Sequence, residues 1–217
     1  MKTQGSTEWH KKRSIHLTAS RFGDILARPT TKRYQNYQLE KVNELSGAPY
    51  MSDDAPWFRP GKELEPIARE RYEFEMSIRG EQTTVKQVFF IEHPEYPFIG
   101  CSPDGLVLPN KGIEIKSSTV YAGYLKNVSK GLPATHRPQV QGQIWVCGYD
   151  SVDFVCFFRD PDGLMPDEIN IINVLPDLKY HKMLEEKCLI FWEEIQNQMG
   201  VYNWESDGEK DDWLDGI

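Results

Sequence analysis

Residues 99–118, IGCSPDGLVLPNKGIEIKSS, place two carboxylates and a lysine within runs of apolar residues. Asp104 stands in a Pro-Asp-Gly break, and Glu114 and Lys116 lie two positions apart. Because side chains alternate between the two faces of a strand, Glu114 and Lys116 are expected on one face and Ile115 in the core. A carboxylate among buried strand residues needs a partner such as a cation. The stretch therefore predicts two strands that present Asp104 and Glu114 to a divalent metal ion.

A lysine beside such an ion orients or deprotonates a water molecule, and this is the layout of a metal-dependent phosphodiesterase. An Asp, a Glu and a Lys at this spacing also occur by chance in solvated hairpins, so the motif alone is weak. The turn-like break before the apolar residues 106–108 and the buried character of the flanking strands favour the metal site. Glu65, in the first turn of an expected helix, is a further candidate acid, although surface glutamates are common at helix starts.

The 217 residues are enough for one domain with a sizeable core. We expect this domain over residues 1–205 and an acidic tail over residues 206–217. No run of 18 apolar residues predicts a membrane span, and the N-terminus lacks the apolar middle of a signal peptide. Four scattered cysteines without Cys-x-x-Cys indicate reduced thiols rather than disulfides, structural zinc or an iron–sulfur cluster. The five histidines show no ligand spacing.

The net charge of −8 is unevenly distributed along the chain. Residues 1–41 carry nine Lys and Arg against three acids, and no carboxylate lies between Lys116 and Tyr149. A local basic surface binds phosphates even when the whole protein is anionic. The average charge therefore neither supports nor excludes a nucleic-acid substrate.

Apolar periodicity and turn signals give the expected elements. Helices are expected over about 21–26, 34–45, 121–126, 138–146 and 178–199, with a further helix that has Pro66 in its first turn. Strands are expected over 85–91, 98–108, 112–117, 152–158 and 168–174, and residues 46–61 read as a loop. This order predicts an α/β or α+β fold with a mixed central β-sheet flanked by helices.

Two further groups of residues have the chemistry to bind phosphate. Arg13, Thr18 and Ser20 precede an expected helix, where free N–H groups, a hydroxyl and an arginine form an anion cradle. An ordinary helix cap with a surface arginine is the alternative. Gln139 and Gln141 flank a helix start and suit phosphate or sugar oxygens, or are polar positions on an amphipathic helix.

Taken in order, the segments WHKKR, LTAS, PGKELE, CSPDG, GIEIK and QVQGQIW resemble the lambda exonuclease family of phage recombination nucleases, also called YqaJ-like. This family is a branch of the PD-(D/E)xK, restriction-endonuclease-like superfamily. The matching segments run through most of the chain, and the match weakens after about Asp150. The resemblance implies a restriction-endonuclease-like core and an ATP-independent exonuclease that digests double-stranded DNA from 5′ to 3′. The product would be a 3′ single-stranded overhang for single-strand-annealing recombination.

The resemblance also implies roles for residues in this sequence. Asp104, Glu114 and the backbone carbonyl of Ile115 would bind Mg²⁺, with Mn²⁺ as a substitute and probably two ions per site. Glu65, in PGKELE, would hold metal-bound water. Lys116 would align or activate the attacking water. No histidine is needed, because metal-bound water loses a proton far more readily than bulk water.

Other positions match the parts of the family that contact DNA. A pocket for the 5′-phosphate is matched by Arg13, Ser20, Ser102 and Gln139. Phe58 falls where the family has an apolar wedge that splays the terminal base pairs, although a core aromatic is an equal alternative. Weaker candidates for DNA contact are Arg28, Lys32, Arg33 and Gln141.

The resemblance implies partners as well as a substrate. Family members are ring-shaped homotrimers that encircle double-stranded DNA and work with a single-strand annealing protein. A phage- or prophage-encoded enzyme acting in the bacterial cytoplasm, with no membrane partner, is expected. The acidic tail, which carries Trp213 and Leu214, is either a docking segment or a frayed terminus.

Three other functions remain open from the sequence. A site-specific endonuclease or junction resolvase of the same fold would cut closed circular DNA, whereas an end-dependent enzyme would not. A catalytically inert DNA-end binding or loading factor is disfavoured by the complete set of Asp104, Glu114 and Lys116. An RNA nuclease is disfavoured because the sequence offers no stacked aromatic platform for single strands.

Overall fold

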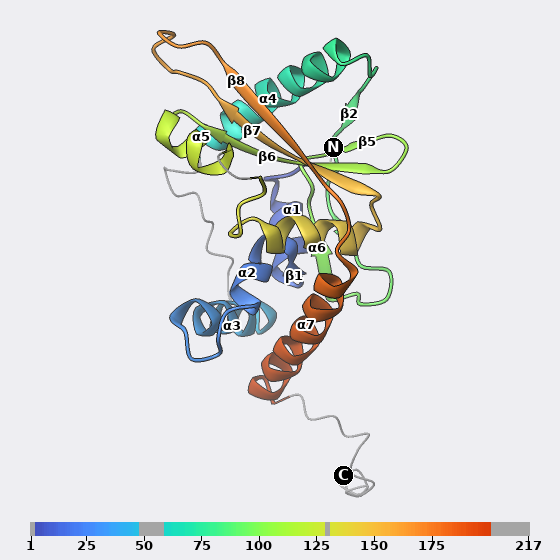
Figure 1. Ribbon diagram of the computed structural model, residues 1–217. Helices are drawn as coiled ribbons and strands as arrows, with labels where there is room; N and C mark the ends of the chain where they lie inside the picture. Colours follow the sequence, from blue (N-terminus) through green and yellow to red (C-terminus); the bar gives the residue numbers. More distant parts are fainter. Residues whose placement is uncertain (1–2, 48–58, 129–130, 201–217) are drawn as a thin grey trace, which may run out of the picture.

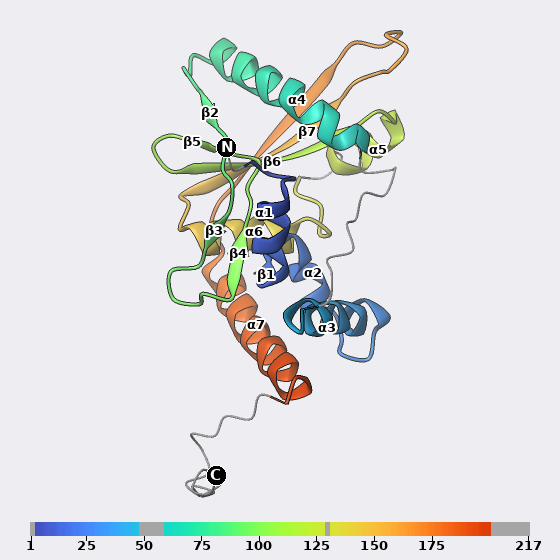
Figure 2. The same cartoon turned by 180° about the vertical axis from the view of Figure 1, so that it is seen from behind.

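The computed structural model describes residues 3–47, 59–128 and 131–200, and it contains two mixed sheets with helices around them (Figures 1 and 2). The larger sheet has the order β2-β5-β6-β7-β8. Its strands are β2 (Val85–Lys86), β5 (Gly105–Val107), β6 (Lys111–Ser118), β7 (Ser151–Phe158) and β8 (Glu168–Val174). Strands β6 and β7 are parallel, and the other neighbouring pairs are antiparallel. The predicted mixed central sheet flanked by helices is therefore confirmed.

Strand β7 lies at the centre of the core, and every one of its residues is buried. One face of the sheet packs against α4 (Arg59–Ile78), and the opposite face packs against α5 (Tyr121–Val128) and α6 (Arg137–Cys147), as Figure 1 shows. Val155 and Phe157 belong to the α4 side, while Phe154 and Cys156 belong to the α6 side. The apolar run over residues 154–158 of β7 follows from this, because a strand covered on both faces has no solvent-facing position.

The second sheet has the order β1-β4-β3 and packs beside the N-terminal and C-terminal helices (Figure 2). Its strands are β1 (Leu17–Thr18), β4 (Ile99–Cys101) and β3 (Ile91–Glu92). The helices around it are α1 (Thr7–Ser14), η1 (Ala19–Arg21), α2 (Phe22–Ile25), α3 (Lys32–Leu45) and α7 (Leu178–Gln198). Gly142 lets α6 lie against this layer, since a Cβ there would stand 2.5 Å from the Phe22 ring.

Two predicted strands are wrong in their extent. The strand expected over 98–108 divides into β4 and β5, which belong to different sheets. Pro103 stands at the division, and proline cannot donate a hydrogen bond to a neighbouring strand. The strand expected over 85–91 is likewise two short strands, β2 and β3, in different sheets. Residues 102–104 therefore connect the two sheets, which places Asp104 at their junction.

Three helices also differ from the prediction. Helix α4 begins at Arg59, so Pro66 lies inside it rather than in its first turn. The helix expected from residue 21 begins with the 3₁₀ turn η1 at Ala19. Helix α1 was not predicted, because none of its residues is buried and it therefore shows no apolar periodicity. The Ser6 hydroxyl caps α1 by accepting from the Trp9 N–H over 3.3 Å.

Among the residues that the structure describes, no helix is both long and apolar enough to cross a bilayer. The predicted acidic tail over 206–217 lies outside the described residues, as does Phe58.

Candidate active site

The structure brings Asp104, Glu114 and Lys116 together at the edge where β5 and β6 meet the smaller sheet. Glu114 and Lys116 lie two positions apart on β6, and their side chains form an ion pair with 2.7 Å between Nζ and Oε1. Asp104 approaches from the break before β5, and its Oδ2 accepts from the Ile115 N–H over 2.6 Å. Glu114 is 2% exposed. Two carboxylates and a charged amine thus occupy one largely enclosed site.

Two glutamines of α6 hold the buried Glu114. Gln139 donates from Nε2 to Oε1 of Glu114 over 2.6 Å, and its own Oε1 accepts from Lys116 over 3.2 Å. Gln143, one helical turn later, donates to Oε2 of Glu114 over 2.5 Å. Gln143 was missed in the sequence, although its spacing of four from Gln139 places both on one face of a helix.

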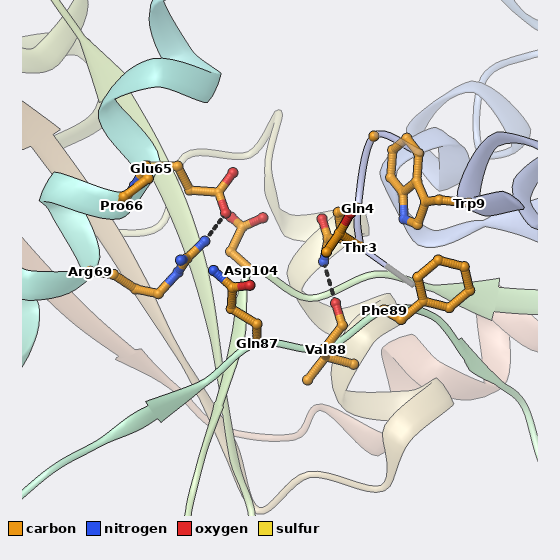
Figure 3. A pocket seen from close by; sticks show the side chains of 11 residues that line it. Thr3, Gln4, Trp9, Glu65, Pro66, Arg69, Gln87, Val88, Phe89 and Asp104 are labelled. Atoms are coloured by element: carbon orange, nitrogen blue, oxygen red, sulfur yellow. Dashed lines mark hydrogen bonds and ion pairs between the residues drawn. The ribbon is translucent and has the colours of Figure 1, made fainter. Parts of the chain in front are cut away.

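Glu65 and Arg69 complete this side of the site from α4. They form an ion pair, and both line a pocket of about 380 Å³ together with Asp104. In Figure 3 the carboxylates of Glu65 and Asp104 point toward one another in this pocket. The opposite wall comes from the N-terminal segment, where Gln4 donates to the carbonyls of Val88 and Pro103 over 2.7 Å and 2.8 Å.

The charges of this site are unbalanced. Burial and the neighbouring carboxylates of Glu114 and Glu65 raise the pKa of Asp104 well above its usual range. Burial also raises the pKa of Glu65, although Arg69 opposes that shift. Burial acts against the charge on Lys116, yet Glu114 and Asp104 outweigh it and raise the pKa of the lysine. Lys116 is therefore protonated. When the carboxylates of the site are ionised, their negative charge exceeds the positive charge beside them.

A divalent cation fits this imbalance, and the donors are the hard oxygens that Mg²⁺ prefers. No group of three His, Cys, Asp or Glu side chains within residues 3–47, 59–128 and 131–200 is arranged to hold a metal ion. The protein would thus supply Asp104, Glu114 and a backbone carbonyl, and leave the remaining positions to water and substrate. Such partial coordination is usual for Mg²⁺, which rarely occupies an all-protein cage.

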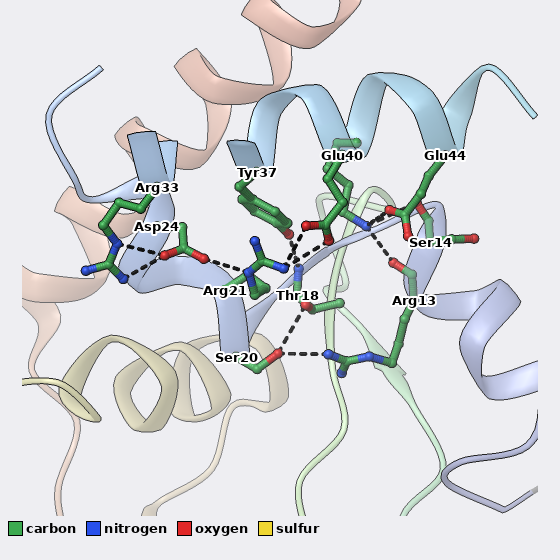
Figure 4. Close-up of polar contacts among 11 residues, drawn as sticks. Arg13, Ser14, Thr18, Ser20, Arg21, Asp24, Arg33, Tyr37, Glu40 and Glu44 are labelled. Carbon is green, nitrogen blue, oxygen red and sulfur yellow. Dashed lines mark hydrogen bonds and ion pairs between the residues drawn. The ribbon is translucent and has the colours of Figure 1, made fainter. Parts of the chain in front are cut away.

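Arg13, Ser20 and Ser102 also lie close together, at the end of α1 (Figure 4 shows Arg13 and Ser20). Arg13 Nη2 donates to Oγ of Ser20 over 2.9 Å, and Ser20 shares a 3.3 Å hydrogen bond with the Thr18 hydroxyl. Trp9 links the third residue, because its indole N–H donates to Oγ of Ser102 over 2.8 Å and its ring lies 4.4 Å from the Arg13 guanidinium carbon. We call Arg13, Ser20 and Ser102 the anion cluster.

The remaining predicted DNA contacts do not join either group of residues. Arg28 and Lys32 are exposed, and the exposed Arg33 pairs with Asp24 over 2.6 Å. Gln141 is 3% exposed, donates to the Leu175 carbonyl, and accepts from the Asp177 N–H. The side chain of Gln141 is therefore used within the fold. Gln139 contacts Glu114 and Lys116, so these hydrogen bonds belong to the carboxylate site rather than to the anion cluster.

Trp9 links the anion cluster to the pocket of the carboxylate site, since Trp9 and Asp104 both line this pocket. Trp9 contacts the anion cluster directly, while Asp104 belongs to the carboxylate site. An anion held by Arg13 would therefore lie one side chain, Trp9, away from the pocket that Asp104 lines.

Comparison with known proteins finds solved structures that share this fold. An alkaline exonuclease, LHK-Exo from Laribacter hongkongensis, matches with a TM-score of 0.77 and 28% identity over 93% of this chain and 98% of that chain. The structure of LHK-Exo in complex with dAMP gives the same values. A phage related exonuclease from Haemophilus somnus 129PT shares the fold, with a TM-score of 0.64 and 15% identity over 86% and 96% of the two chains. These likenesses confirm the restriction-endonuclease-like fold.

No curated protein sequence matches the chain. The family model for the YqaJ-like viral recombinase domain matches residues 8–150, which include Arg13, Glu65 and the whole Asp104–Glu114–Lys116 set. The chain belongs to the YqaJ-like viral recombinase domain family.

Proposed function

We propose that this protein is a metal-dependent, ATP-independent exonuclease that digests one strand of double-stranded DNA from its 5′ end and leaves a 3′ single-stranded overhang. The single observation that carries the proposal is the position of Trp9, which contacts Arg13 and Ser102 of the anion cluster and lines the same pocket as Asp104. An anion site one side chain away from the pocket of a hydrolytic site suits a substrate with a terminal phosphate and a nearby phosphodiester. The family and the exonuclease relatives support a DNA nuclease of the recombinase family.

In this mechanism Asp104, Glu114 and the Ile115 carbonyl would hold Mg²⁺, for which Mn²⁺ would substitute. Bound metal, two ions per site in our proposal, would provide a nucleophilic water and neutralise charge on the leaving oxygen. Gln139 and Gln143 keep the Glu114 carboxylate in one orientation by donating to its two oxygens. Glu65 would accept a hydrogen bond from metal-bound water, and Arg69 opposes the rise in the pKa of this carboxyl group that burial causes.

Lys116 acts as a charged donor. Its raised pKa keeps the ammonium protonated near neutral pH, so it aligns the attacking water and stabilises the negative charge that develops on the phosphate. Water attacks the phosphorus atom and loses a proton to solvent, the bond to the 3′ oxygen breaks, and that oxygen leaves with a proton from solvent. The products are a nucleotide and a chain with a new 5′-phosphate.

The anion cluster explains selection for DNA ends. Arg13 and the hydroxyls of Ser20 and Ser102 would bind the terminal 5′-phosphate through charge-assisted hydrogen bonds. Only a chain end places such a phosphate beside the carboxylate site, so internal phosphodiesters are not selected. Each cut produces a fresh 5′-phosphate that enters the cluster in turn. Arg28, Lys32 and Arg33 are proposed as weaker contacts to the duplex.

We extend the proposal to assembly and partners on the family resemblance. A homotrimeric ring around the duplex would give processivity without sequence preference, and it requires basic charge only on the inner surface. A single-strand annealing protein would bind the exposed 3′-ended strand. Within a bacterial cell that carries the phage or prophage, both proteins would act in the cytoplasm.

The test compares three DNAs with purified protein and Mg²⁺. They are a linear duplex labelled at each end, the same duplex without 5′-phosphates, and a covalently closed circle. Loss of 5′-terminal nucleotides from the phosphorylated linear DNA, with the circle intact, is the expected result. EDTA should stop the reaction, and ATP should have no effect. Cutting of the circle would instead identify an endonuclease or junction resolvase, and no cleavage with retained end binding would identify an inert loading factor.

A further inference from the structure

Helix α3 contacts the backbone of the anion cluster from behind, through a lysine that the proposed chemistry does not use. Lys41 is 3% exposed, which is unusual for a lysine. Its Nζ donates to the carbonyl oxygens of Arg13 and Ser14 over 3.0 Å and 3.1 Å, and to Oε2 of Glu44 over 2.6 Å. Figure 4 shows the three residues that accept from it, Arg13, Ser14 and Glu44. Lys41 thus binds the last residues of α1, including the backbone of the residue whose side chain meets Ser20.

The three acceptors indicate that Lys41 is charged. An ammonium group has three N–H donors, and each of these three has one acceptor. Burial lowers the pKa of Lys41, and the Glu44 carboxylate opposes that shift. The last carbonyls of a helix have no partner within the helix, so a buried cation there satisfies them.

Tyr37, one turn earlier on α3, holds the other side of the cluster. Its hydroxyl accepts from the Thr18 N–H over 3.3 Å, and its side chain is fully buried. Thr18 is two residues from Ser20 and shares a hydrogen bond with it. Residues four apart lie on one face of a helix, so Tyr37 and Lys41 bind the two chain segments that supply Ser20 and Arg13.

We propose that Lys41 is a positioning residue for recognition of the 5′-phosphate. It fixes the C-terminal end of α1 so that the Arg13 guanidinium stands 2.9 Å from the Ser20 hydroxyl, without itself touching DNA. Through Tyr37 and Lys41, α3 sets the distance between Arg13 and Ser20 before the substrate binds. This inference rests on the proposed function, and it adds a residue that acts through Arg13.

The test measures kcat/KM for the same duplex with 5′-phosphate and with 5′-hydroxyl ends, and takes the ratio of the two. Lys41→Met removes the three donors at nearly the same length. The ratio is expected to fall by about ten- to hundredfold. Without Lys41 the Arg13 guanidinium is displaced, and misplacing a bound group by about 1 Å costs up to about 10²-fold in rate. A lysine that only stabilised the fold would lower both rates together and leave the ratio unchanged.

A double-mutant cycle shows whether Lys41 acts through Arg13. In an Arg13→Ala background, Lys41→Met should change the ratio no further, because the group that Lys41 positions is already missing. Tyr34→Phe is the matched control, since it removes a 2.7 Å hydrogen bond from α3 to Glu194 on α7. Tyr34→Phe should keep the wild-type ratio. If Lys41→Met alone does not fold, Lys41→Met/Glu44→Gln leaves no unpaired buried carboxylate and takes its place in the cycle.

The outcomes separate this inference from the proposed function. A wild-type preference for phosphorylated ends that persists in Lys41→Met, or in the double variant, overturns the role of Lys41 and leaves the proposed function intact. Additive effects of Lys41→Met and Arg13→Ala overturn it as well. If the unmodified protein cuts phosphorylated and hydroxyl ends equally, the anion cluster and the role of Lys41 fail together.

Discussion

Nε2 of Gln143 lies 2.5 Å from Oε2 of Glu114, so a glutamine of α6 holds a carboxylate of β6 that is 2% exposed. The other oxygen of Glu114 accepts from Gln139 and Lys116. A carboxylate with donors on both oxygens keeps one orientation, which a metal ligand requires. The contact also shows that α6 supports the site, although it contributes no acid to it.

Gln143→Met should therefore lower both stability and activity. Oε2 of Glu114 would be buried without its donor, and this costs about 1–3 kcal/mol of unfolding free energy. Urea unfolding in EDTA measures the loss, and the cleavage rate with Mg²⁺ measures the effect on the site. Gln139→Met is the matched variant with a smaller stability loss, because Lys116 still donates to Oε1. Unchanged stability of Gln143→Met would contradict the role given to this hydrogen bond.

Asp104→Asn should abolish cleavage and raise the melting temperature of the metal-free protein. The substitution removes a metal ligand, so the rate should fall by at least ~10²-fold. It also removes a buried carboxylate whose ionisation Glu114 and Glu65 oppose, while Asn still accepts from the Ile115 N–H. Thermal melts in EDTA and duplex-binding titrations check both effects, and binding should remain.

Lys116→Met provides the opposite control for Asp104→Asn. It should also be inactive and bind duplex DNA, but its metal-free form should melt at a lower temperature, because the carboxylates lose their compensating charge. Equal shifts of the melting temperature in the same direction for both variants would refute the charge imbalance.

The stability difference between Asp104→Asn and the unmodified protein should depend on pH. A carboxyl group with a folded-state pKa above its unfolded value binds protons more tightly when folded. The unmodified protein therefore loses stability relative to Asp104→Asn as pH rises from ~4 through the raised pKa, and the difference then levels off. Urea unfolding across this range in EDTA measures it. Mg²⁺ should shrink or reverse the difference, because the ion favours the ionised carboxylate, and a constant difference would contradict the assignment.

Arg13→Ala should weaken the preference for phosphorylated 5′ ends. The guanidinium is the charged donor of the anion cluster, and losing it should reduce the ratio of kcat/KM values for phosphate and hydroxyl ends by ~10-fold or more. Arg28→Ala is the control, since an exposed contact to the duplex should weaken binding to both ends alike and reduce its salt dependence. A preserved ratio in Arg13→Ala would remove Arg13 from phosphate recognition.

Arg69→Met should move the acidic limb of the pH–rate profile to higher pH. Arg69 lowers the pKa of Glu65 against the effect of burial, so its removal raises that pKa further. More alkaline solution is then needed to ionise Glu65. The profile of kcat/KM with Mg²⁺ measures the shift. Arg71→Met, which removes the distant contact to Glu75, should leave the limb in place. An unmoved limb in Arg69→Met would exclude Glu65 as the titrating group.

The local pattern of apolar residues was sufficient to predict the ranges of many helices and strands. Helices α3, α5, α6 and α7, and strands β6, β7 and β8, lie close to the predicted ranges because each has a clear apolar period or run. Helix α1 has no buried residue and so left no pattern. The division of 98–108 into two strands depends on pairing, since β4 pairs with β1 near the N-terminus while β5 pairs with the neighbouring β6, and periodicity does not encode this choice of partners.

The sequence by itself determined the chemistry of the site, because Asp104, Glu114 and Lys116 are close in the chain and strand alternation fixes their relation. The resemblance likewise named Arg13, Ser20 and Ser102, which lie together in the fold. Only the tertiary structure decided which residues support them: Gln143 on Glu114, Trp9 between Arg13 and Ser102, and Lys41 on the Arg13 carbonyl. These contacts join segments 28 to 93 residues apart. Their geometry comes from the packing of α1, α3 and α6 around the two sheets, and no local propensity specifies it.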